Sequence, residues 1–407
     1  MIAPKLRFSE FKDEWIELSL KEYYSKIRNG FVGVATPFYV ENGIKYLQGK
    51  NIKDGKIDPK GLIYISEDFH HKKNNSQLKQ NDILMVQSGH VGECAVVTQD
   101  YENANCHALI ILSPDHNEKV NSHFVVYYFY SHYGKKRISE IKTGNTIEHV
   151  LASEIKEVTL NFPTPKEQTK IAEFLSAVDD KISQLSRQLE LLNQYKKGVM
   201  QKIFSQEIRF KNDNGEDFGE WEEVPLNQIA SKVTVKNRGN KVTEVLTNSA
   251  TQGIIKQSDF FDREIVSESN INGYYVVEVD DFVYNPRISV HAPVGPIKRN
   301  KITQGIMSPL YTVFRFKEGN LDFLSYFFET NFWHDYVKSV ANSGARHDRM
   351  NITNSDFLEM PILLPSIQEQ EKIAEFLTAI DKRIDHTTAQ LTQTKQWKKG
   401  LLQQMFV

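Results

Sequence analysis

The chain has 407 residues, of which 40% are hydrophobic and 25% are charged, a balance typical of a globular protein with more than one domain. Two cysteines exclude a disulfide framework, and a net charge of -2 does not by itself predict a polyanionic partner, although nucleic-acid binding needs only a basic face. The longest apolar run, at 124–130, is too short to span a membrane, and residues 1–5 hold no apolar signal core. We therefore expect a cytoplasmic protein.

Residues 1–160 predict a globular head of mixed α/β structure. Short β-type runs at 83–86, 95–98 and 108–112 are separated by turn residues, and a helix is expected near 122–141. Basic and polar residues late in this helix and in the loop after it are candidate DNA contacts: Lys135, Lys136, Arg137, Lys142, Thr143 and Asn145. For any one of them, a solvated helix face is an equally good interpretation.

Residues 161–208 predict a long helical arm. Thr164 is a typical N-cap, Pro165 suits the first helical position, and Glu167 completes a capping box. Apolar residues then recur at alternating steps of four and three, which predicts a coiled-coil seam nearly five heptads long and about 60 Å in extent. The residues expected at this interface are Ile171, Leu175, Val178, Ile182, Leu185 and Leu189. Lys196 is a polar position in the seam, and Gly198 is a candidate break.

Residues 209–360 predict a second mixed α/β head. β-type runs fall at 274–279 and 311–316, and a helix is expected near 321–341. The candidate DNA contacts are again basic residues near loops: Arg287, Lys298, Arg299, Lys301, Arg346, His347 and Arg349.

Residues 361–407 predict a second arm. Ser366 and Glu369 give another capping box, and Gly400 is another candidate break. The expected seam residues are Ile373, Leu377, Ile380, Ile384 and Leu391. Three further seam positions are polar, so the outer half of this seam is the weaker one: Thr387, Thr394 and Lys398.

The two arms are copies of each other. Residues 163–205 recur as 365–407 at a constant offset of 202, with 20 of 43 positions identical, so the chain consists of two half-molecules. The heads echo each other faintly, since Arg7-Phe8 recurs as Arg209-Phe210 before a Trp in both. We expect the arms to pair with each other as an antiparallel coiled coil, related by an internal pseudo-two-fold repeat. A homodimeric coiled coil, or helices packed on their own domains, are the alternatives.

No catalytic site is evident in the sequence. Residues 43–51 imitate a phosphate-binding loop, but the glycines are one residue too far apart and Asn51 replaces the Ser or Thr that binds magnesium. Cys94 and Cys106 suit a core, and the histidines lack zinc-site spacing. With no visible nucleophile, base and acid, we expect a binding protein that is not an enzyme and holds no metal or cofactor.

The ordered set of motifs resembles the specificity subunit of type I restriction–modification systems. The resemblance covers nearly the whole chain and rests on two divergent heads with near-identical arms. In the first head it rests on Ala35-Thr36-Pro37, Gly43-Ile44-Lys45-Tyr46-Leu47, Asn51-Ile52, Asp82-Ile83-Leu84, Ser88-Gly89 and Gly92. In and after the arms it rests on Tyr195-Lys196-Lys197-Gly198, Arg209-Phe210, Glu220-Trp221, Leu363-Leu364-Pro365-Ser366 and Glu369-Gln370.

The resemblance implies a function in DNA recognition. Each head would be a target recognition domain that reads one half of a split target in double-stranded DNA, and the paired arms would set the unread gap. The subunit would be non-catalytic and would assemble with two adenine-methyltransferase subunits and with restriction subunits. S-adenosylmethionine, ATP and magnesium are then expected in those partners.

Two alternatives remain from the sequence. A specificity subunit of a fused nuclease–methyltransferase would have a single large partner. A scaffold with coiled-coil arms and protein-binding heads would have no affinity for DNA, with or without a methyltransferase.

Overall fold

The computed structural model describes the chain except for residues 1, 116–118, 145–146, 260–267 and 343–347. The chain divides into two compact units, one of Met1–Arg187 with Thr388–Val407 and one of Gln188–Thr387. Each unit contains one head, part of the arm that follows it and part of the other arm. The compact units therefore cut through both arms, whereas the domain limits expected from the sequence follow the order of the chain.

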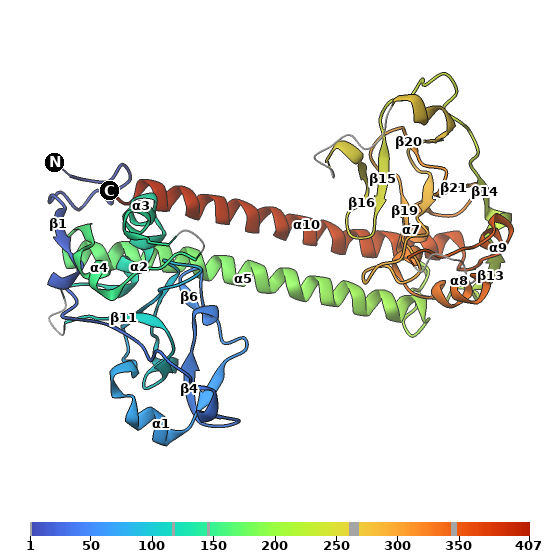
Figure 1. Cartoon of the computed structure of the whole chain (residues 1–407). Coiled ribbons are helices and arrows are strands. Elements are labelled where there is room, and N and C mark those ends of the chain that lie inside the picture. Colours follow the sequence, from blue (N-terminus) through green and yellow to red (C-terminus); the bar gives the residue numbers. More distant parts are fainter. Residues whose placement is uncertain (1, 116–118, 145–146, 260–267, 343–347) are drawn as a thin grey trace. The chain divides into compact units, whose positions relative to one another are not determined.

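The two arms are the helices α5 (Pro165–Phe204) and α10 (Ile367–Gln404), drawn in green and red in Figure 1. They begin directly after Thr164 and Ser366, as the capping residues predict. Both continue through Gly198 and Gly400, and a Cβ at either glycine would meet no atom within 4 Å. Neither glycine is needed for packing, so each only costs its helix about 1 kcal/mol.

The first head contains β1 (Ile16–Ser19), β2 (Lys26–Asn29), β3 (Tyr39–Val40), β4 (Ile44–Leu47), β5 (Ile52–Lys53), β6 (Lys56–Ile57), β7 (Ile63–Ile65), β8 (Ile83–Val86), β9 (Cys94–Val96), β10 (Asn105–Cys106), β11 (Leu109–Ser113) and β12 (Thr159–Phe162). Its helices are α1 (Glu67–Lys72), α2 (Ser122–Tyr130), α3 (His132–Ile141) and α4 (Ala152–Glu157). The runs expected at 83–86, 95–98 and 108–112 correspond to β8, β9 and β11.

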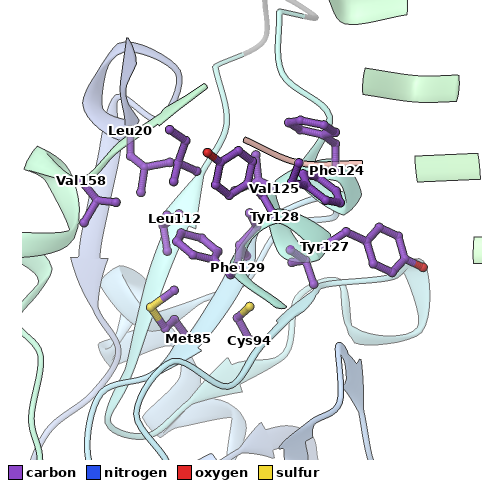
Figure 2. Packing of buried hydrophobic residues seen from close by; sticks show 14 of the residues in the cluster. Leu20, Met85, Cys94, Leu112, Phe124, Val125, Tyr127, Tyr128, Phe129 and Val158 are labelled. Carbon is purple, nitrogen blue, oxygen red and sulfur yellow. The ribbon is translucent and has the colours of Figure 1, made fainter. Parts of the chain in front are cut away.

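The central sheet of the first head is antiparallel, in the order β2-β11-β8-β9. Side chains alternate along each strand, so Ile110 and Leu112 belong to the cluster under α2, whereas Leu109 and Ile111 belong to the cluster on the other face. Both faces are buried, which explains why these strands are continuous apolar runs. Figure 2 shows α2 side chains packed with Met85, Cys94 and Leu112.

The second head contains β13 (Glu222–Pro225), β14 (Ala230–Lys232), β15 (Leu246–Ser249), β16 (Gly253–Lys256), β17 (Tyr275–Val277), β18 (Phe282–Tyr284), β19 (Ile297–Arg299), β20 (Gly305–Met307), β21 (Thr312–Phe316) and β22 (Pro361–Leu364). Its helices are α6 (Leu226–Ile229), α7 (Leu321–Glu329), α8 (His334–Val340) and α9 (Asn354–Leu358). Its central sheet is also antiparallel, in the order β14-β21-β18-β19, so the faint echo between the heads reflects a repeated sheet.

The helix expected near 122–141 is in fact two helices, α2 and α3. Ser131 separates them, because its hydroxyl donates to the Tyr128 carbonyl at 2.6 Å and accepts from the Gly134 amide at 3.1 Å. A Cβ at Gly134 would lie 2.1 Å from the Tyr128 carbonyl oxygen, so the turn requires glycine. The helix expected near 321–341 is likewise divided into α7 and α8.

Each head is closed by a short antiparallel ladder directly before its arm. In the first head β1 pairs with β12, and in the second β13 pairs with β22. Within the described residues, no helix is both long and apolar enough to cross a membrane, and no three His, Cys, Asp or Glu side chains are placed to bind a metal ion.

Candidate nucleic-acid interface and its supports

A buried glutamate near the start of each arm ties the arm to the segment that leads into its head. The Glu167 carboxylate accepts from Arg7 through Nε and Nη2, both at 2.7 Å, and from Trp15 Nε1 at 3.3 Å. Glu167 is fully buried, and the hydrogen bonds to it raise the pKa of Arg7. The sequence predicts that Glu167 completes a capping box. In the structure its carboxylate accepts hydrogen bonds from the distant residues Arg7 and Trp15.

The second arm repeats this anchor. The Glu369 carboxylate accepts from Arg209 at 3.1 and 2.8 Å and from Trp221 Nε1 at 3.2 Å. Glu369 is also fully buried. The repeated Arg-Phe and Trp of the sequence thus have a structural role. In each copy the Arg and Trp side chains bond to the glutamate of an arm: Arg7 and Trp15 to Glu167, and Arg209 and Trp221 to Glu369.

The glutamine that follows each anchoring glutamate holds a head helix in place. Gln168 Oε1 accepts from the amide of Asn121, which caps α2, at 2.9 Å. Gln370 Oε1 accepts from the amide of Asn320, which caps α7, at the same distance. The Glu-Gln dipeptide at the start of both arms thus fixes the head against the arm through two separate contacts.

Most of the predicted seam residues lie where the arms meet the core of each unit. In the first unit Ile171, Leu175 and Val178 are buried in one cluster with Leu401 of α10 and Met405 just after it, and Ile182 packs beside them. In the second unit Ile373, Leu377, Ile380 and Ile384 pack with residues of α5 such as Ile203. Leu185 is buried, whereas Leu189 and Leu391 are half-buried. Within each unit the two helices therefore share an apolar core.

The end of each arm packs into the head that belongs to the other half of the sequence. Phe406, after α10, lies 5.4 Å from the rings of both Phe124 and Tyr128 in the first head. Phe204, at the end of α5, lies 5.3 Å from Phe323 in the second head. Both phenylalanines are nearly inaccessible to solvent. Each head is thus completed by a residue from the opposite arm.

The described candidate DNA contacts of the first head lie on α3 or directly after it. Lys135 and Lys136 are exposed, and Lys136 approaches Glu140 at 4.0 Å. Arg137 pairs with Glu17 at 2.7 Å, and Lys142 pairs with Glu148 at 2.8 Å. These pairs are solvent-exposed and weak, so they leave the cations able to exchange partners. Thr143 is exposed, and Asn145 lies outside the described residues.

In the second head the structure separates the candidates by environment. Arg299 donates to Asp280 at 2.8 Å and to Asp322 at 2.9 Å and is mostly buried, so its side chain connects β19 to α7. Lys301 pairs with Asp322 at 3.3 Å and remains exposed. Arg287 is exposed and forms a β-bridge with Arg349, which brings two candidates together. Arg346 and His347 lie outside the described residues.

Lys298 lines a cavity of about 660 Å³ in the second unit. Lys196, Lys197, His291 and His334 also line it, with Phe328 and Trp333 among the apolar residues. Burial lowers the pKa of His334, which favours its neutral form. Lys196 is paired with Glu329 and Asp381, whereas neither Lys197 nor Lys298 has an ion pair within the described part of the chain. The cavity thus offers two available cations to an anionic group.

The sequence model of the family described as type I restriction modification DNA specificity domain matches residues 12–194 and again residues 219–396. The chain belongs to this family. The two matches cover both heads and most of both arms, so the repeat seen in the sequence is a repeat of the specificity domain. The chain is a DNA sequence-specificity protein of the type I restriction–modification family, which argues against the scaffold alternative.

Relatives along the full length support this assignment. The putative type I restriction enzyme MjaX specificity subunit of Methanocaldococcus jannaschii is 25% identical over 417 residues, covering 98% of this chain and 94% of that protein. The type I restriction enzyme EcoKI specificity subunit of Escherichia coli K12 is 20% identical over 394 residues, covering 89% and 82%.

Solved structures share the fold of this specificity protein. The S subunit of a type I restriction–modification system from M. genitalium aligns with a TM-score of 0.60 at 15% identity, covering 100% of this chain and 99% of that one. The HsdS subunit from Thermoanaerobacter tengcongensis aligns with a TM-score of 0.50 at 15% identity, covering 96% of both.

Proposed function

We propose that this chain is the specificity subunit of a type I complex and reads a split DNA target, with one head for each half and with the paired arms setting the unread gap. The observation that carries the proposal is the repeated anchor, in which Glu167 and Glu369 hold two different heads by the same bonds. Identical supports under divergent heads suit a protein that reads two different sequences at one spacing.

Within each head, we propose that the exposed cations contact DNA. In the second unit Lys197 of α5 and Lys298 of the head would bind phosphate at the cavity, and Arg287 beside Arg349 would approach the bases or the backbone. In the first head α3 and the loop after it would serve the same purpose. Phosphate contacts position the protein, so we expect these lysines to contribute affinity more than sequence preference.

We propose that the chain has no catalysis of its own and acts in the cytoplasm with two adenine-methyltransferase subunits and with restriction subunits. S-adenosylmethionine, ATP and magnesium would be bound by those partners. The net charge of -2 supports this division, because a chain that bound DNA alone would need a stronger basic surface. The partners would then supply much of the phosphate binding.

Exchanging one head tests the one-head, one-half assignment. Residues 1–160 would be replaced by the first head of a relative with a different target, in a complex with the methyltransferase subunit. We expect N6-methyladenine mapping to show one changed half, one unchanged half and an unchanged gap. A change in both halves would refute independent reading by the two heads.

Shortening both arms tests their role as a spacer. Deleting residues 186–192 and 388–394 removes one heptad from each helix and leaves both anchors in place. One heptad corresponds to about 10 Å of helix, or about three base pairs of DNA, so we expect a gap shorter by about that amount. Shortening one arm alone is the control and should abolish methylation, because the two helices then lose a common register. An active double deletion with the original gap would refute the spacer role.

A further inference from the structure

A lysine, an aspartate and a tyrosine join three elements of the first unit. Lys398 on α10 lies 2.6 Å from Asp179 Oδ1 on α5, and Tyr127 on α2 donates to Asp179 Oδ2 at 2.9 Å. The Lys398 ammonium also lies 5.6 Å from the centre of the Tyr127 ring. We call these three residues the first clasp. Asp179 is largely buried, so its charge depends on these partners.

The second unit repeats the arrangement atom for atom. Lys196 on α5 lies 2.8 Å from Asp381 Oδ1 on α10, and Tyr326 on α7 donates to Asp381 Oδ2 at 2.7 Å. Lys196 lies 4.9 Å from the Tyr326 ring centre and also pairs with Glu329 at 3.1 Å. These residues, Lys196, Asp381 and Tyr326, form the second clasp. The lysines and aspartates of the two clasps are related by the offset of 202.

The clasps place a charged lysine at a seam position of each arm. Both lysines occupy seam positions where an apolar residue would be more stabilising, and polar residues at such positions are known to select one helix register. The aspartate and the lysine are equally far apart on both arms, so both clasps are satisfied by one antiparallel register.

A slip of one heptad would break both clasps at once. By the spacing of the sequence, each lysine would face a residue without charge: Ala374 or Thr388 for Lys196, and Ala172 or Ser186 for Lys398. The aspartates would face apolar residues: Leu391 or Met405 for Asp179, and Leu189 or Ile203 for Asp381. The leucines and isoleucines of the seam discriminate less, because a heptad slip brings similar residues together.

We propose that the two clasps are positioning residues that lock the arms in one register and thereby hold the gap between the half-sites at one length. This inference rests on the proposed spacer function. Because each clasp also bonds to a helix of a head, it transmits the register of the arms to the position of the head. The chemistry required is a cation facing an aspartate across the seam, with the tyrosine holding the aspartate.

The test removes the charges and keeps the shape of the sites. The fourfold variant Lys196→Met, Asp381→Asn, Lys398→Met and Asp179→Asn leaves no buried charge alone, and asparagine can still accept from the tyrosines. The matched control is Lys181→Met with Arg383→Met, two exposed cations near the clasp aspartates that are related by the same offset of 202. Wild type, variant and control would each be studied as the full chain.

The first measurement needs no DNA. Spin labels on Glu173→Cys and Ala389→Cys, both exposed and both in the first unit, report the distance between the arms, while the native Cys94 and Cys106 are buried. We expect one distance in wild type and control, and in the fourfold variant a second population displaced by about 10 Å, one heptad of helix. A single unchanged distance in the variant would overturn the proposal.

The second measurement is the methylated motif in the assembled complex. We expect the variant to methylate targets with the original gap and with gaps changed by about three base pairs, whereas the control keeps one gap. A lower melting temperature with one unchanged gap would make the clasps merely stabilising and would also overturn the register role. Failure of the proposed function gives a different result from failure of the clasp proposal, because the wild type itself would then show no split motif.

Discussion

Replacing Phe406 by alanine should destabilise the first head although the two are far apart in sequence. The ring is 1% exposed and contacts Trp15, Phe124 and Tyr128. Truncating a buried phenylalanine costs about 3–5 kcal/mol, because the lost contacts leave a cavity. For a unit of this size, that corresponds to a melting transition lowered by roughly 6–20 °C.

Hydrogen exchange followed by mass spectrometry checks where this destabilisation occurs. In Phe406→Ala, we expect amides of β8, β11 and α2 to exchange faster, while amides of the second head keep their protection. Phe204→Ala is the matched control and should reverse the pattern, exposing β18, β21 and α7. If Phe406→Ala loosens the second head, or if both variants affect both heads alike, the completion of each head by the opposite arm is wrong.

Three further predictions concern single contacts. Arg7→Met leaves the buried Glu167 carboxylate without its cation and should cost about 3–5 kcal/mol in urea unfolding, with partial recovery on adding Glu167→Gln; additive effects would contradict the coupling. Lys298→Ala should reduce the magnitude of the slope of log DNA affinity against log salt concentration by about one and leave the melting temperature unchanged. Arg299→Ala should lower the melting temperature, because Arg299 bonds to two aspartates; equal behaviour of the two variants would refute their different environments. Burial lowers the pKa of His107 below its ordinary 6.5, so the unfolded chain binds the proton more readily, and stability should fall as pH falls below about 6.5; a His107→Gln variant with the same pH dependence in thermal melts would exclude this contribution.

Features that depend on local pattern were predictable from the sequence. The arms follow from the heptad spacing and from the capping residues Thr164 and Ser366, and both helices begin where those residues indicate. The apolar runs at 83–86 and 311–316 became central strands because buried strands need no alternation. The pairing of the two arms with each other followed from two matched seams in one chain.

Features that depend on long-range partners were not predictable in the same way. Glu167 satisfied a local capping rule, yet its partners Arg7 and Trp15 lie in a distant segment. From the sequence, Arg299 was grouped with the exposed cations. In the structure its side chain donates to Asp280 and Asp322, and the local sequence around Arg299 does not reveal these contacts. The order of the strands was likewise beyond the sequence, since short apolar runs do not specify their neighbours.

The clasps were only partly predictable from the sequence. Lys196 and Lys398 were visible only as polar exceptions in the seam, and Asp179 and Asp381 lie outside the seam pattern. The signal that could have found them is the offset of 202, which preserves all four residues while much of the surrounding sequence changes. A charge preserved in both copies of a seam therefore indicates a cross-arm partner.

The most direct test of the central claim is a map of the DNA that this chain directs a methyltransferase to modify. The chain would be co-expressed with its adenine-methyltransferase subunit in a host free of other modification, and N6-methyladenine would be located by direct sequencing. The account predicts a split motif of two short defined halves around a gap of one fixed length. A continuous motif, or a soluble complex that neither binds nor methylates DNA, would contradict it.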